Sequence, residues 1–258
     1  PYKNCLTFHP PRAILPLAFR SYPIVTDIRY YLGFNLISQI GPVKVRRLLD
    51  YFGDLATAWT AGAHELAEAG LDKRALENFL NARHTLDLDA ELEKIQRAGI
   101  RALCWDDPDY PRRLREIPTP PTILYIKGAI KPEDEWSLAV VGTRRASSYG
   151  KEVTRQIVTD LVRNKMTIVS GLARGVDAEA HRAALEAKGR TIAVQGCGLD
   201  IIYPPEHKKL AEEIIANGAL VSEYPLGTQP EAGNFPPRNR IISGLSLGAL
   251  LVEGNEST

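Results

Sequence analysis

The most constraining feature of this chain is an alternation of short apolar segments with longer amphipathic ones, which begins near residue 138. The apolar segments have the length and character of strands buried on both faces, and the amphipathic ones have helical periodicity. The predicted strands are residues 138–141, 167–169, 191–195, 219–222 and 249–253, and the predicted helices are residues 151–163, 178–187 and 205–216. Strands joined in succession by helices imply an α/β fold with a mostly parallel sheet and helices on both faces.

Residues 26–99 show a different, purely helical pattern. Their apolar residues recur at helical spacing, without the alternation of a strand. The predicted helices begin at residue 28 and cover residues 43–52, 64–69, 73–86 and 89–98. Two strand-like segments, residues 102–105 and 122–126, then flank a proline-rich connector. We therefore predict a small all-α domain at residues 24–99 and an α/β domain at residues 100–258.

Residues 1–23 are predicted to belong to neither domain. They are proline-rich and aperiodic, and they lack the charged head, apolar middle and cleavage site of a signal peptide. We expect a disordered arm or an extension added to the natural chain. Because the chain stops at Thr258, just after an apolar segment, the C-terminal part of the second domain is expected to be missing.

The segment from Ile40 to Leu49 is similar to the hairpin of a helix-hairpin-helix module. In such a hairpin, a turn containing glycine exposes backbone N–H groups at a helix start, where they can hold a phosphate. Gly41 and Pro42 also suit an ordinary turn between two packed helices, since proline is favoured in the first helical turn. Both readings stay open, as does contact of the helical domain with another protein.

The overall charge and the cysteine content narrow the class of protein. The net charge is only +1, from 32 basic and 31 acidic side chains, so any site for a polyanion must be local. No apolar stretch approaches the roughly 20 residues of a membrane span. Cys5, Cys104 and Cys197 are widely spaced, which fits a reducing compartment. We expect a cytoplasmic protein without a membrane contact.

Glycines and arginines follow the predicted parallel strands at the edge where ligands bind in open sheets. Gly142 and Arg144 follow the first strand, and Ser170, Gly171 and Arg174 follow the second. Glycine lets the backbone approach a ligand closely, and a guanidinium group suits a phosphate. These loops lack the GxGxxG and GxxxxGK[ST] patterns, so no dinucleotide or P-loop nucleotide cofactor is expected.

A fourth loop, predicted at residues 234–246, combines an aromatic residue with a basic cluster. Phe235 lies three residues before Arg238, Asn239 and Arg240. A ring that stacks on a base, beside cations that hold the backbone, is typical of proteins that bind single-stranded nucleic acid. The alternative is that Phe235 is buried and the two arginines pair with carboxylates.

Two weaker patterns concern metal binding and nucleophilic catalysis. Asp177 and His181 share one helix face, but no third metal ligand has recognisable spacing, and Asp177 is well placed to cap a helix beginning at Ala178. Cys197 lies near the ligand edge, but a nucleophile would need a base such as His207 or His181 within reach. We expect no metal, no cofactor and no catalytic residue.

Five ordered motifs carry a resemblance to a known family. They are VVGTRRASSYG, VSGLARGVDAEAHRAAL, TIAVQGCGLDIIYPPEH, SEYPLGTQP and FPPRNRIISGLS. In this order they resemble the DNA-processing protein A (DprA, also Smf) family, from about Leu32 to Thr258. The resemblance implies a SAM-like helical domain before an extended Rossmann-like domain that forms a homodimer. It also implies single-stranded DNA binding, protection of incoming DNA in natural transformation, and loading of the RecA recombinase, with no catalytic activity.

The resemblance also implies which residues contact DNA. Arg144 and Arg174 match the basic residues of two turns, and Phe235, Arg238 and Arg240 match the aromatic and basic positions of the last motif. The remaining expected site residues, which would line the pocket, are Gly142, Ser147, Ser170, Gly171 and Asn239. The family's sheet is expected to continue after Val252, in the region that pairs subunits and meets RecA.

Two other functions stay open. One is a nucleotide-processing enzyme of the phosphoribohydrolase type, although its PGGxGTxxE loop is absent and only Glu223 and Glu253 could replace the catalytic glutamate. The other is a recombination scaffold that does not bind DNA. In that case the loops would be purely structural.

Overall fold

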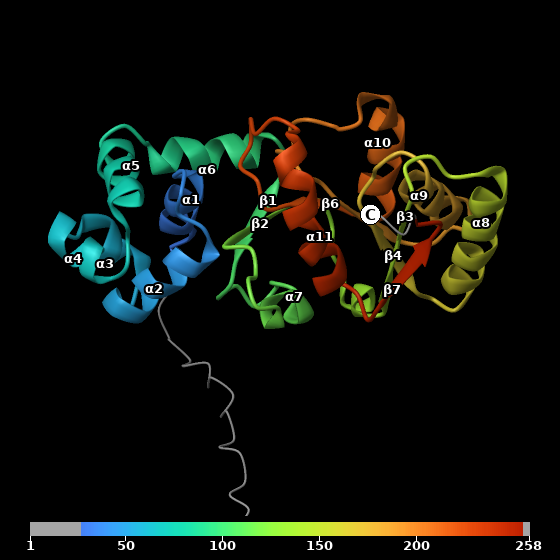
Figure 1. Ribbon diagram of the computed structural model, residues 1–258, viewed down its shortest axis with the longest axis horizontal. Coiled ribbons are helices and arrows are strands. Elements are labelled where there is room, and N and C mark those ends of the chain that lie inside the picture. The colour runs from blue at the N-terminus through green and yellow to red at the C-terminus, as the bar shows by residue number, and fades with distance from the viewer. Residues whose placement is uncertain (1–26, 255–258) are drawn as a thin grey trace, which may run out of the picture.

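The computed structural model describes residues 27–254, so the prediction for residues 1–23 lies outside the described residues. Within this range the chain forms one seven-stranded sheet of order β1-β2-β6-β5-β4-β3-β7 (Figure 1). The strands are β1 Arg101–Cys104, β2 Ile123–Gly128, β3 Ser137–Gly142, β4 Thr167–Ser170, β5 Thr191–Val194, β6 Ala219–Ser222 and β7 Ala249–Val252. The five strands from β6 to β7 run parallel, and β2 is antiparallel to both β1 and β6. The predicted mostly parallel sheet is confirmed.

Helices cover both faces of this sheet. The connecting helices are α8 Ser148–Arg163, α9 Val176–Glu186, α10 Lys208–Asn217 after the short turn η2 Pro205–His207, and α11 Phe235–Gly244 after η3 Ala232–Asn234. Three successive crossovers move the chain from β3 to β6 in one direction, so α8, α9 and α10 pack side by side on one face. The crossover to β7 returns over the other face, where α11 packs against the short helix α7 Arg112–Glu116.

Six helices form the N-terminal unit. They are α1 Ile28–Leu36, α2 Pro42–Phe52, α3 Leu55–Thr60, α4 Ala63–Glu68, α5 Lys73–Arg83 and α6 Leu88–Arg97. Asp27, Asp54, Asp72 and Asp87 each cap a helix by accepting a hydrogen bond from a backbone N–H of the first turn. Phe34 stacks on Phe79 with ring centroids 5.2 Å apart, and Trp59 meets both rings edge-on. The aspartate caps and this aromatic cluster stabilise helices that are each only 6 to 11 residues long.

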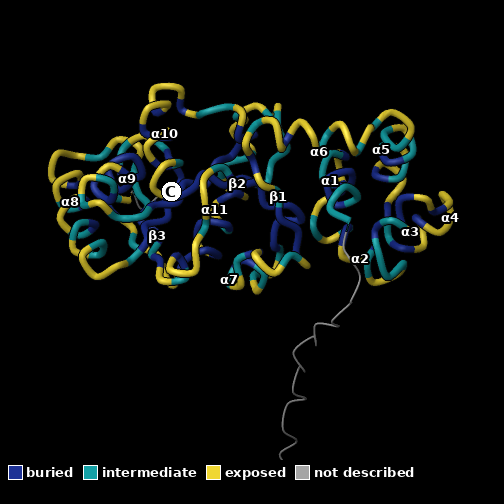
Figure 2. Tube along the Cα trace, turned by 180° about the vertical axis from the view of Figure 1, so that it is seen from behind, coloured by how far each residue is buried: buried dark blue, intermediate teal, exposed yellow. Residues whose placement is uncertain are grey.

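The helical unit is packed firmly against the sheet. Helix α1 lies along β1 and β2, and Tyr31 donates a hydrogen bond to Asp106 at 2.6 Å. Tyr125 of β2 donates to Asn35 of α1 at 2.8 Å, and Arg46 of α2 lies 4.7 Å from the ring centroid of Trp105. One hydrophobic core therefore runs from the helical unit into the sheet, and Figure 2 shows buried stretches in both.

Helix α3 was not predicted, and two further sequence predictions need correction. The proline-rich connector contains helix α7, which was not predicted. The segment at residues 234–246 is not a loop, because most of it forms helix α11. Pro236 and Pro237 occupy the first helical turn, where their missing N–H groups have no helical partner to lose. Of the helices in residues 27–254, none is long and apolar enough to cross a membrane.

Candidate functional site

The loops at the carboxyl ends of the parallel strands meet at one rim of the sheet. The loop after β3 and the loop after β4 are in contact, since Val176 donates its backbone N–H to the Thr143 carbonyl at 3.2 Å. Gly175 has φ +76°, and a Cβ atom there would lie 2.2 Å from the same carbonyl oxygen. Only glycine allows this approach, so Gly175 sets how closely the loops carrying Arg144 and Arg174 pack.

The ring of Phe235 lies at the centre of this rim. It rests on Gly196, where an added Cβ atom would be 2.8 Å from the ring, and its centroid is 5.5 Å from that of Tyr203. The guanidinium carbons of Arg144 and Arg238 each lie 5.8 Å from the Phe235 centroid. The connections through α10 and α11 leave β5 and β6 toward opposite faces, and the ring lies near this point of divergence, which is where ligands bind in open sheets.

Arg174 is exposed at this rim but has a partner within the chain. Its Nε donates to Glu206 at 2.5 Å, and 60% of the Arg174 side chain is exposed. The hydrogen bond to Glu206 raises the pKa of Arg174, and the nearby Tyr203 adds to this effect. The same hydrogen bond lowers the pKa of Glu206. Arg174 is therefore a charged group whose partner a phosphate could replace.

Arg238 is buried beneath the rim. It is 4% exposed and donates hydrogen bonds to the carbonyls of Gly171, at 2.9 Å, and Val194. Burial lowers the pKa of Arg238 and raises the pKa of the nearby Asp177. The charge of each group partly opposes the pKa shift of the other. The Arg238 side chain fastens α11 to the ends of β4 and β5, and the predicted contact of Arg238 with DNA stays a prediction.

Ser170 and Gly171 are also buried and serve the loop after β4. The Ser170 hydroxyl donates to the Val140 carbonyl at 2.6 Å, which ties β4 to β3. The Asp177 carboxylate accepts from the N–H groups of Gly171, at 3.1 Å, and Ala173, at 3.3 Å. Asp177 was expected to cap its own helix; instead, it fixes the shape of the loop that carries Arg174.

Gly142 and Ser147 lie on the loop between β3 and α8. Gly142 ends β3 and pairs with Val252 of β7. Ser147 caps α8 through a hydrogen bond from Gly150 N at 2.9 Å, and its own N–H and hydroxyl both bind the Glu253 carboxylate. The hydrogen bonds from Ser147 hold the pKa of Glu253 below its usual range. The Glu253 carboxylate is thus occupied by hydrogen bonds from the residue that caps α8.

Arg240 and Asn239 point away from the Phe235 ring. Arg240 makes a two-pronged ion pair with Glu223, with both distances 2.5 Å, and donates to the Thr119 carbonyl at 2.9 Å. This pairing is the alternative weighed for the basic cluster. Asn239 is exposed on α11. Of the expected residues, the structure therefore gathers Arg144, Arg174 and Phe235 at the rim surface and places Arg238, Ser170 and Gly171 beneath it.

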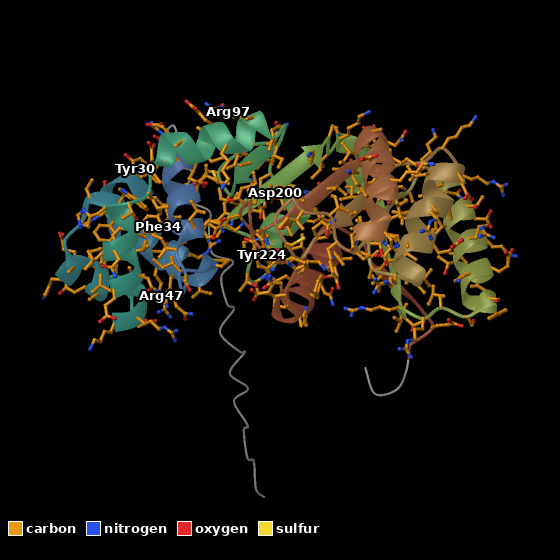
Figure 3. The ribbon with its side chains drawn as sticks, turned by 90° about the horizontal axis from the view of Figure 1, so that it is seen from above. Tyr30, Phe34, Arg47, Arg97, Asp200 and Tyr224 are labelled. Atoms are coloured by element: carbon orange, nitrogen blue, oxygen red, sulfur yellow. The ribbon has the colours of Figure 1, made fainter. Side chains whose placement is uncertain are left out.

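Sequence reasoning missed Tyr203 as a residue of this rim. The Tyr203 ring lies beside the Phe235 ring, and Tyr203 is close enough to Arg174 to raise the pKa of that guanidinium group. The sequence signal was an aromatic residue in the segment that follows β5, and the structure shows that Tyr203 is exposed there. Asp200 and Tyr224, labelled in Figure 3, hold the neighbouring loops: Asp200 accepts from Gly227 N at 2.9 Å, and Tyr224 donates to the Asn234 carbonyl at 3.2 Å.

The weaker candidates for chemistry are all engaged in the fold. His181 is fully buried, its Nδ1 lies 2.7 Å from the Thr191 hydroxyl, and burial lowers its pKa to about 3. Among residues 27–254, no three His, Cys, Asp or Glu side chains are grouped as metal ligands. Burial raises the pKa of Cys197 to about 11, so the group is a neutral thiol at neutral pH. Glu223 is bound by Arg240, which does not favour a role as a catalytic base.

Comparison with known proteins gives consistent matches. The profile of a family described as DNA recombination-mediator protein A matches residues 101–258. Protein Smf of Synechocystis is 44% identical over 229 residues, which are 87% of this chain and 58% of that protein. Protein Smf of Escherichia coli is 41% identical over 189 residues, covering 73% of this chain and 50% of that protein. The chain thus spans about half the length of these relatives.

Solved structures extend the similarity to the fold. The X-ray structure of DNA processing protein A from Streptococcus pneumoniae superimposes with a TM-score of 0.78 and 32% identity, over 90% of this chain and 80% of that one. A structure of DNA processing protein A from Helicobacter pylori, which concerns its single-stranded DNA binding mode, gives a TM-score of 0.56 and 34% identity. It covers 62% of this chain and 71% of that one.

Proposed function

Because this chain belongs to the DNA recombination-mediator protein A family, we propose that it binds single-stranded DNA at the rim around Phe235 and acts without catalysis. In this proposal the strand lies across the carboxyl ends of the parallel strands. The protein protects incoming DNA in natural transformation and delivers it to the RecA recombinase. The family membership and the rim geometry support the proposal from independent directions.

The observation that carries the proposal is the half-buried ring of Phe235 between Tyr203 and the exposed Arg144. An aromatic face accepts a base of any sequence, and a guanidinium group beside it can hold the adjoining phosphate. Arg174, on the loop in contact with that of Arg144, supplies a second cation. This pairing of rings with cations suits an unpaired strand, because bases stacked in a duplex cannot reach a ring at the surface.

The partners form the less direct part of the proposal. A homodimer and a contact with RecA follow from the family resemblance, and the helical unit offers a further surface for a protein partner. The exposed turn at Gly41 begins α2 as a helix-hairpin-helix turn would, and it provides backbone N–H groups at that helix start. A role of this turn in DNA contact remains part of the proposal.

The experiment that tests DNA binding is a titration of fluorescent single-stranded oligo-dT and of a duplex of equal length at two salt concentrations. We expect tighter binding of the single strand, with an affinity that falls as salt rises because phosphate contacts release counterions. No binding would favour the scaffold hypothesis, and equal affinity for both forms would contradict the proposed preference for a single strand. Release of free base from a nucleoside monophosphate would instead favour the enzyme hypothesis.

Phe235→Ala is expected to weaken binding without changing the salt dependence. Loss of one stacked base costs about 1–3 kcal/mol, roughly five- to 150-fold in affinity, and stacking releases no counterions. Trp136→Ala is the matched control, because Trp136 is an exposed aromatic residue at the opposite end of β3. A changed salt slope in Phe235→Ala, or equal losses in both variants, would show that Phe235 does not stack on a base.

Glu206→Gln is expected to strengthen binding. The carboxylate holds Arg174 at 2.5 Å and must be displaced before a phosphate can take its place. Since an exposed ion pair contributes only about 0.2–1 kcal/mol, the affinity for oligo-dT should rise by roughly 1.5- to fivefold. Glu212→Gln, an exposed position on α10, removes the same charge and is the control. If both variants gain equally, the effect is overall charge and not the release of Arg174.

A further inference from the structure

A groove at the amino ends of the parallel strands has no role in the function proposed above. It is a cavity of about 310 Å³ between the β1–β2 hairpin, the start of α7, the turn η1 Pro132–Glu135 and the end of α11. Gly128 of its wall pairs with Ala219, the first residue of β6. The groove therefore lies at the end of the sheet opposite the Phe235 rim. We propose that it binds an acidic peptide segment of a partner protein, one that carries an apolar side chain.

The inner surface of the groove is apolar. Leu103 of β1 and Ile126 of β2 are diagonal neighbours on one face of the sheet, since Leu103 pairs with Leu124, and they line the groove together with Ile130 and Leu245. Leu103, Ile126 and Leu245 are buried, while Ile130 and the exposed Ala129 border the opening. A cavity of this size with an apolar floor has room for one large apolar side chain.

The opening is surrounded mainly by cations. The basic side chains around it are Arg101, Arg112, Arg113 and Lys131. Arg112 is exposed and forms an ion pair with none of the described residues, and Arg101 holds only the exposed Asp109, at 2.6 Å. Three carboxylates also line the groove: Asp109, Asp134 and Glu135. Asp134 is buried and forms an ion pair with Arg190 at 2.7 Å. Arg113 lies 3.7 Å from Glu135, and Lys131 lies 3.9 Å from Glu133. The four cations of the lining exceed its two outward carboxylates, so the net charge offered to a ligand is positive.

Two features favour a peptide over a nucleic acid strand. Asp109 and Glu135 stand among the cations, and they would repel a chain that carries a phosphate at every residue. The apolar walls call for a hydrophobic side chain, which a peptide supplies beside its carboxylates. An acidic peptide can place its charges near Arg101 and Arg112 and avoid the two carboxylates.

The test uses a fluorescein-labelled peptide of several aspartates followed by one phenylalanine, titrated with the full chain and followed by anisotropy. We expect saturable binding, weaker binding when glycine replaces the phenylalanine, and none when lysines replace the aspartates. An Arg101→Glu/Arg112→Glu variant should bind at least about tenfold more weakly, since both cations face the ligand. Ala129→Trp should do the same by filling the groove without changing its charge.

Two further variants separate this proposal from its alternatives. Arg163→Glu alters an exposed arginine of α8 outside the groove and should leave peptide affinity unchanged. Arg144→Ala/Arg174→Ala alters only the rim and should also leave it unchanged, so failure of the DNA proposal would not affect this one. No binding by the parent chain, or equal binding by the groove variants, would overturn the inference. Displacement of the peptide by oligo-dT, with weaker oligo-dT binding by Arg101→Glu/Arg112→Glu, would reassign the groove to nucleic acid.

Discussion

An Arg144→Ala/Arg174→Ala variant is expected to bind single-stranded oligo-dT at least about 100-fold more weakly than the parent chain, because each of the two lost charged hydrogen bonds contributes about 1.5–3 kcal/mol. Both arginines are exposed at the rim, and Arg144 lies beside the Phe235 ring. Each is expected to neutralise one phosphate. The slope of log affinity against log salt should therefore fall by about 1.4, at about 0.7 for each phosphate on a single strand. Titrations at several salt concentrations measure both quantities.

The matched control is Arg97→Ala/Arg163→Ala. It removes the same charge from two exposed arginines, each of which pairs within its own helix. We expect this control to bind nearly as the parent does. Equal losses in the two double variants would mean that net charge, and not the rim, determines binding. An unchanged slope in the rim variant would contradict the phosphate contacts directly.

Arg238→Met is expected to lower the free energy of unfolding by about 3 kcal/mol, because each buried group left without a hydrogen-bond partner costs about 1–3 kcal/mol. The substitution removes the donor for the carbonyls of Gly171 and Val194. It also removes the positive charge nearest the buried Asp177. Urea unfolding followed by circular dichroism measures the loss, and Asn239→Ala, an exposed change on the same helix, should cost under about 0.5 kcal/mol.

The stability deficit of Arg238→Met should narrow as the pH is lowered. Burial raises the pKa of Asp177 in the folded protein, and Arg238 opposes that rise. Without the arginine, the folded pKa rises further above the unfolded one. The carboxylate then costs stability at neutral pH, and this cost is lost as the pH falls through the folded pKa. A deficit that is below about 1 kcal/mol at pH 7, or one that grows on acidification, would contradict the buried role of Arg238.

The sheet was predictable because buried parallel strands are local apolar segments with helices between them. Residues 219–222 match β6, and the other strands of the α/β region differ only at their ends. Helix α11 was missed because two prolines next to an Arg-Asn-Arg cluster are typical of an exposed loop. Its helical signal was the spacing of Arg238, Ile241 and Ile242, which share its buried face. An arginine is rarely buried, so the sequence pattern hid that face.

The candidate site was predictable only in part. Arg144, Arg174 and Phe235 could be placed at one rim because residues that follow parallel strands meet at the same edge. The partners of the arginines could not. Glu206 and Arg174 are 32 positions apart, and Glu223 and Arg240 are 17 apart. No local rule joins such pairs, and whether an arginine is free or paired depends on the packed structure.

The contact of α1 with β1 and β2 has a mechanical consequence. Tyr31 and Tyr125 fasten the helical unit to the sheet within one continuous core, so the two halves lack a joint about which to swing. A protein that bound the outer helices would therefore have a fixed position relative to the Phe235 rim.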